Sequence, residues 1–190
     1  MSESKLSPVF TLKQAIESGL SRRQVESKVA EGTFLKVGHG LYLNPNSGIS
    51  AEYADFIAAC EKLGENSYVG GLSALFYYGL IDTPPQQIWV VVYHTKRTVE
   101  KKYKLIRTRK IYEYGIVNRD NFRICDINRA VVDAFRYSSK IGTRTAFTSA
   151  VRAITDKKTT VSEILKTAKN LECEKMMKKH INTILGMLEA

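Results

Sequence analysis

The chain has 190 residues, 44% of them apolar, which is enough for one large or two small folded domains. Its formal net charge of +10 and isoelectric point near 9.5 favour an anionic partner, either nucleic acid or an anionic membrane surface. No apolar run approaches the ~20 residues of a membrane span, and the polar first ten residues do not fit a signal peptide, so we expect a cytoplasmic protein with no membrane partner.

The segment 11–44 has the pattern of a winged helix-turn-helix. Thr11 is predicted to cap a short helix, and Gly19 is placed to end it in a left-handed turn. Ser21 then caps a second helix, and Gly32 stops it. Two short strands joined by a glycine-permissive turn complete the pattern as the wing.

The second helix is the predicted DNA-reading element, because Val25 and Val29 form its inner face and its cationic residues point mostly outward. Arginine and glutamine there can donate to base edges, and lysine can contact phosphates. A solvated face on any small helical domain would show the same charges. The predicted DNA contacts are Ser21, Arg22, Arg23, Gln24, Ser27 and Lys28 on the helix and Lys36 and His39 on the wing.

A turn-rich stretch at 44–48 divides the sequence. We expect a winged helix-turn-helix domain at 1–48 and a mixed α/β domain at 49–190, which together make an α+β protein. In the second domain, strands are predicted at 88–93, 103–107, 111–114 and 122–125, with a turn at 118–121. Helices are predicted at 50–63, where Ser50 is the cap, and at 127–135, 143–154, 161–168 and 172–188. A further helix is predicted directly after Gly70-Gly71.

The positive charge is concentrated in the segment 96–123, which has ten Lys and Arg against three acids. Its tyrosines alternate with cations, which would suit base stacking beside phosphate contacts, although a half-buried strand or a hydrated loop gives the same pattern. The candidate nucleic-acid or toxin-antagonism surface is Lys96, Arg97, Lys101, Lys102, Lys104, Arg107, Arg109 and Lys110.

The sequence offers little for catalysis. Gly70 and Gly71 before a helix could cradle a phosphate, or they could allow the helix to pack closely on a sheet. A nucleotidyltransferase core also begins this way, but it needs carboxylates for Mg²⁺ on the next strand, and residues 87–92 include none.

The remaining chemistry-bearing residues fit structural roles. Asp126 is interpreted as a helix cap, and Asp133 as the partner of Arg129 or Arg136. The three cysteines and three histidines are scattered without a metal-binding spacing. We therefore expect no enzyme, no metal and no cofactor.

Short motifs over residues 10–140 follow an order found in one protein family. They are Phe10-Thr11-Leu12, Gly19-Leu20-Ser21, Glu31-Gly32, Gly40-Leu41-Tyr42, Ser73-Ala74-Leu75, Gly79-Leu80, Pro84-Pro85 and Asn128-Arg129-Ala130-Val131-Val132-Asp133. In these motifs the chain resembles the AbiEi family of antitoxins from bacterial type IV toxin–antitoxin (abortive infection) operons. That family's winged helix usually opens with a full helix, which residues 1–10 do not supply, so we expect the helix at 50–63 to replace it.

The resemblance implies two activities. The winged helix would repress its own operon by binding repeated operator sequences, as a dimer or as two copies on one site, and the second domain would neutralise a nucleotidyltransferase toxin without requiring a stable complex. The alternative is an RNA- or toxin-binding module that uses the segment 96–123 and does not bind DNA sequence-specifically.

Overall fold

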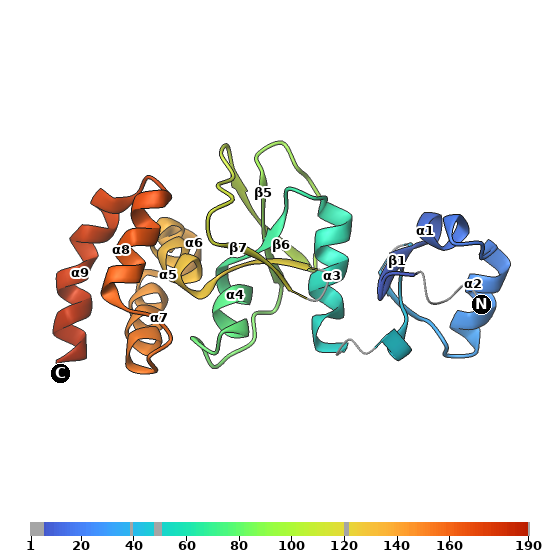
Figure 1. Cartoon of the computed structure of the whole chain (residues 1–190), viewed down its shortest axis with the longest axis horizontal. Coiled ribbons are helices and arrows are strands. Elements are labelled where there is room, and N and C mark those ends of the chain that lie inside the picture. The colour runs from blue at the N-terminus through green and yellow to red at the C-terminus, as the bar shows by residue number, and fades with distance from the viewer. Residues whose placement is uncertain (1–5, 39, 48–50, 120–121, 190) are drawn as a thin grey trace.

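The computed structural model of the protein describes residues 6–38, 40–47, 51–119 and 122–189. The molecule is elongated, and its elements follow one another along the long axis (Figure 1). A small N-terminal unit lies at one end, a five-stranded sheet with its flanking helices lies in the middle, and the C-terminal helices lie at the other end. The fold is α+β, as predicted.

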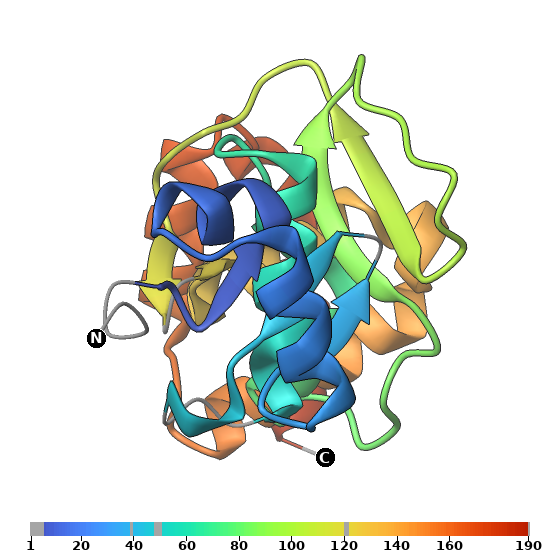
Figure 2. The ribbon, with the colours of Figure 1, turned by 90° about the vertical axis from the view of Figure 1, so that its right-hand side faces the viewer.

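The N-terminal unit has the elements of a winged helix-turn-helix. They are β1 (Val9–Thr11), α1 (Leu12–Glu17), α2 (Arg22–Ala30), β2 (Leu35–Gly38) and β3 (Leu41–Leu43). Viewed from this end, α1 and α2 lie in front of the rest of the molecule (Figure 2).

The predicted caps of both helices are present. The Thr11 side chain accepts a hydrogen bond from the backbone N–H of Gln14, and the Gln14 side chain accepts one from the backbone N–H of Thr11, which makes a capping box. Ser21 forms the same arrangement at the start of α2. Between the helices, Gly19 has a φ of +96°, the left-handed conformation that glycine tolerates best.

The sheet of this unit has a third strand that the sequence did not predict. β1 pairs antiparallel with β3, which gives the order β1-β3-β2. The sheet is apolar on both faces. Phe10 packs with Phe34 and Val25 in the core of the helix-turn-helix, whereas Val9 and Leu43 belong to the main core of the molecule.

The helix α3 (Ala51–Leu63) is present as predicted, but it does not take the place of a first helix. Its buried residues Ala54, Ile57 and Ala58 share a cluster with Val9 and Leu43, so it covers the face of the small sheet opposite to α1 and α2. The core beneath α1 and α2 includes no α3 residue. The predicted cap Ser50 lies outside the described residues.

The five-stranded sheet lies on the other side of α3. Its strands are β4 (Tyr68–Val69), β5 (Ile88–Tyr93), β6 (Tyr103–Thr108), β7 (Ile116–Arg119) and β8 (Phe122–Cys125), in the order β6-β5-β4-β8-β7. β5 has a neighbour on both edges, as its apolar sequence predicted. Its alternate residues divide between the two faces, because Val90 and Val92 pack in the cluster with Ala59 and Leu63 of α3, and Val91 lies in the other core.

Helices cover the far face of the sheet and extend to the C-terminus. They are α4 (Gly71–Tyr77), α5 (Ile127–Arg136), α6 (Ser138–Ile141), α7 (Thr143–Thr155), α8 (Val161–Asn170) and α9 (Glu174–Leu188). All were predicted except the single turn α6. As the structure shows, α4 packs on β5 and α5, and α5 in turn packs on α7 and α8.

Two neighbouring predictions were wrong. Residues 111–114 are not a strand, and β7 occupies part of the segment that was predicted as a turn. The reason is a buried side chain. The Arg129 guanidinium, 1% exposed, donates to the carbonyl oxygens of Tyr112 and Tyr114, so these groups are not free to pair in a sheet.

Arg129 belongs to a buried polar network. Its Nη2 donates to the Tyr68 hydroxyl at 2.6 Å, and its Nε donates to Asp133 at 3.3 Å. Asp133 also accepts from Arg136 at 2.6 Å, so it partners both arginines that were considered for it. Asp126 caps α5, as predicted, by accepting from the Arg129 backbone.

The paired glycines are explained by close packing. A Cβ atom at Gly70 would come within 2.8 Å of Val91 Cγ2, and one at Gly71 within 2.7 Å of Trp89 Cε3. Both residues are buried. Ser73 on α4 also accepts a hydrogen bond from the backbone of Trp89 at 2.9 Å, which fixes the helix to β5.

Candidate nucleic-acid interface

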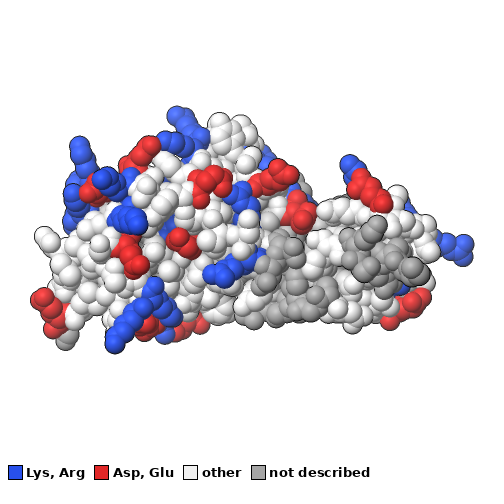
Figure 3. Space-filling view, viewed as in Figure 1, with Lys and Arg blue, Asp and Glu red and all other residues white. Residues whose placement is uncertain are grey.

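The outer face of α2 is exposed, and its inner face is anchored in the core. Val25 is fully buried and Leu20 is 6% exposed, while Ser21 to Gln24 and Ser27 are exposed. The helix is therefore fixed with its cationic side outward, which is the arrangement that a major-groove contact requires. A basic side chain projects from this end of the molecule (Figure 3).

The two arginines of α2 differ in their surroundings. Arg22 donates from Nε to the Glu26 carboxylate at 2.9 Å, and that hydrogen bond raises the pKa of the guanidinium. Arg23 makes no hydrogen bond or ion pair with any of the residues that the structure describes. Arg23 is thus the cation of this helix most directly available to DNA.

Other predicted contacts already have intramolecular partners. The Gln24 side chain accepts from the Ser21 backbone at 2.7 Å, which uses one of the two acceptor positions of its oxygen and leaves both amide N–H groups for a base edge. Ser27 donates to Glu31 at 2.7 Å. Lys28 is half-buried, with its ammonium 5.5 Å from the centre of the Phe34 ring.

The wing contributes one described cation. Lys36 is exposed on β2 opposite Tyr42, next to a bulge that separates it from Gly38 in the register. The other predicted wing contact, His39, lies outside the described residues.

The second basic surface lies around β6 and the loop that leads into it. One of its members, Lys102, connects this surface to the wing. Its Nζ donates to the Val37 carbonyl oxygen of β2 at 3.0 Å and lies 3.6 Å from Asp55 of α3. Lys102 therefore connects the small sheet to the larger one, and it places the wing beside the second basic surface.

Several further cations of this surface are also engaged. Arg97 donates to the His94 carbonyl at 2.7 Å and Arg107 to the Lys96 carbonyl at 3.0 Å. Both arginines therefore stabilise the loop through neutral carbonyl groups, which do not neutralise their positive charge. Lys110 forms an ion pair with Glu172 at 2.6 Å.

The rest of this surface is more open. Lys104 lies near the Trp89 ring, 6.0 Å from its centre. Within the described part of the chain, the side chains of Lys96, Lys101 and Arg109 have no hydrogen-bond or ion-pair partner. These three, with Lys104, are the members that an external anion could reach without breaking an internal ion pair.

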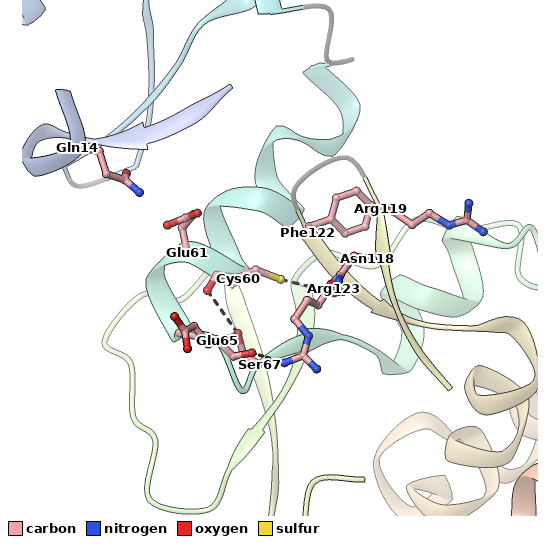
Figure 4. A pocket seen from close by; sticks show the side chains of 10 residues that line it. Gln14, Cys60, Glu61, Glu65, Ser67, Asn118, Arg119, Phe122 and Arg123 are labelled. Carbon is pink, nitrogen blue, oxygen red and sulfur yellow. Dashed lines mark hydrogen bonds between the residues drawn. The ribbon is translucent and has the colours of Figure 1, made fainter. Parts of the chain in front are cut away.

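A cleft of about 710 Å³ separates α1 from the C-terminal half of α3 and from β7 and β8 (Figure 4). Its charges are mixed, because Glu61 and Glu65 line it together with Arg119 and Arg123. Arg123 is paired with Glu113 and donates to the Glu65 carbonyl. The cleft is therefore not a continuation of the basic surfaces.

Cys60 also lines this cleft, and it is a poor nucleophile. Its thiol donates to the Arg123 carbonyl oxygen at 3.6 Å, and burial raises its pKa from 9.0 to about 11. In the described ranges, no three His, Cys, Asp or Glu side chains are placed to hold a metal ion together. None of the described helices has the length and apolar character needed to cross a bilayer.

Comparison with known proteins gives one similarity, and it lies in the N-terminal unit. Residues 2–45 match the family model described as "Transcriptional regulator, AbiEi antitoxin". The match covers β1, α1, α2 and the wing, and it confirms the predicted resemblance over this segment. No curated protein matches the chain.

Proposed function

We propose that this chain, whose residues 2–45 match the family model of AbiEi antitoxin transcriptional regulators, represses its own operon and counteracts a nucleotidyltransferase toxin. In this proposal α2 reads operator DNA, and the part from residue 49 onward acts against the toxin. The observation that carries the first activity is the exposed, cationic face of α2, which is held outward by Val25 and Leu20.

The DNA-binding activity can be tested with the chain's own promoter. Labelled promoter duplex and a scrambled duplex of equal length are titrated with the protein in excess random RNA. We expect binding to the promoter duplex to survive the competitor and to exceed binding to the scrambled duplex, because base contacts distinguish the two. Equal binding to both duplexes would contradict the proposal.

The antitoxin activity requires a separate test. The full chain is co-expressed with the toxin encoded beside it, and growth is compared with expression of the toxin alone. We expect the full chain to restore growth, and failure of the full chain would refute this half of the proposal.

The segment around β6 favours a second candidate function, binding of RNA or of the toxin itself. It is supported by the exposed side chains of Lys101 and Arg109 and the half-buried side chain of Lys96, none of which has an ion-pair partner among the described residues. In this candidate the chain does not bind DNA sequence-specifically. If it is correct, replacing these three by alanine will abolish growth rescue, and the wild-type protein will not distinguish promoter from scrambled duplex. If repression alone is altered, the segment serves DNA binding.

We further propose that the chain is not an enzyme. β5, which follows the paired glycines and α4, has the sequence Ile-Trp-Val-Val-Val-Tyr, without the carboxylates that two Mg²⁺ ions would need. Metal-dependent turnover of a nucleotide by the purified chain would overturn this part of the proposal.

A further inference from the structure

Glu26 stands out on α2 because it is an acid on the surface that is expected to approach DNA. Its side chain is 60% exposed and lies one turn after Arg22, whose side chain is 73% exposed. A carboxylate at this position repels phosphates and should weaken binding to DNA in general. Any favourable contact between Glu26 and DNA must therefore be made to a base and not to a phosphate.

The geometry of the pair suggests such a role. Arg22 uses its Nε to contact Glu26 at 2.9 Å, which leaves both terminal nitrogens of the guanidinium without a partner among the described residues. An arginine donates in this way to O6 and N7 of guanine, and a glutamate accepts from the N4 amino group of cytosine. The contact to Glu26 also restricts the orientation of the guanidinium before DNA is bound.

We propose that Arg22 and Glu26 form one base-reading unit, which selects a guanine and a nearby cytosine in the major groove of the operator. Arg22 supplies the donors, and Glu26 supplies the acceptor and keeps Arg22 in place. Repulsion between Glu26 and phosphates weakens binding to other sequences and so increases discrimination. The inference rests on the proposed DNA-binding function and adds the bases that are read.

An exposed ion pair of this spacing also occurs where no base is expected, so the chain offers a matched control. Lys13 and Glu17 on α1 have the same four-residue spacing, at 3.8 Å, and Glu17 is 62% exposed. If such pairs only support their helices, changes at Glu17 and Glu26 should have the same effects.

The test is selection of binding sites from promoter duplexes in which each base pair is varied in turn, with wild type, Glu26→Gln, Glu26→Ala and Glu17→Gln. We expect wild type to prefer cytosine at one position by between about 5- and 150-fold. Glu26→Gln should shift that preference to adenine, because glutamine pairs with N6 and N7 of adenine. Glu26→Ala should lose the preference and bind scrambled duplex more tightly, and Glu17→Gln should behave as wild type.

Two outcomes would overturn the inference in different ways. If both Glu26 variants keep the wild-type base preferences, Glu26 is only a helix-supporting residue, and the proposed function is untouched. If wild type itself does not distinguish promoter from scrambled duplex, the proposed DNA-binding function fails, and the inference fails with it.

Discussion

The buried network around Asp133 should be the most sensitive polar site in the protein. Asp133→Ala removes the carboxylate that faces Arg129 and Arg136, and Arg129 is as buried as Asp133, at 1% exposure. Removing one partner of a buried ion pair typically costs about 3–5 kcal/mol, since the remaining charge stays desolvated. For a chain of this size, such a loss should lower the melting temperature by roughly 6–20 °C.

Urea denaturation followed by circular dichroism measures the free energy of unfolding directly. The matched control is Glu172→Ala, which breaks an ion pair with Lys110 in which both side chains are at least 60% exposed. We expect the control to lose far less stability, because solvent screens an exposed pair. If Asp133→Ala loses no more than Glu172→Ala, the network does not hold the structure together as described.

Individual contacts can also be tested one at a time. Gly71→Ala should lose about 1–3 kcal/mol of stability, because the new Cβ would meet Trp89 and φ is +55°. Gly186→Ala in α9 has open space around it and should gain up to about 1 kcal/mol. Urea denaturation measures both variants, and equal stabilities would contradict the prediction. Burial raises the pKa of Cys60 to about 11, so its thiolate is scarce at pH 8 in the folded protein. Alkylation of Cys60, measured by peptide mass spectrometry, should therefore be much slower in the folded protein than in urea. Equal rates would contradict this burial. Lys102→Ala should speed amide hydrogen exchange in β2, because the hydrogen bond to the Val37 carbonyl is lost. Unchanged protection would show that this hydrogen bond does not stabilise β2.

Much of the fold could be predicted from the sequence because its signals are local. Thr11, Ser21 and Thr160 precede their helices as capping residues, and all three form capping boxes. The β5 sequence is apolar throughout and proved to be an interior strand. In each case, neighbouring residues decide the local structure.

The errors came from long-range contacts. Residues 111–114 alternate like a strand, but Arg129, more than a dozen residues later, binds the carbonyls of Tyr112 and Tyr114. β1 has only three residues, and its partner β3 lies about thirty residues further on. No local pattern reveals either pairing.

The candidate sites show the same limit. The exposure of Arg23 could be predicted from helical periodicity. The contacts by which Lys102 connects the two sheets could not be predicted, because Val37 and Asp55 approach it only in the folded chain. Glu26 was not among the predicted contacts, since its spacing from Arg22 is also that of an ordinary helix-stabilising pair.

Salt-dependent binding of promoter duplex tests most directly whether Arg22 and Arg23 contact DNA. The double variant Arg22→Ala, Arg23→Ala is compared with Lys166→Ala, Lys169→Ala, which removes the same charge from the exposed face of α8. We predict that the first variant loses its preference for promoter over scrambled duplex and up to about two units of salt slope, and that the second stays close to wild type. Promoter binding by the arginine variant with wild-type affinity and salt slope would contradict a DNA-reading role for α2.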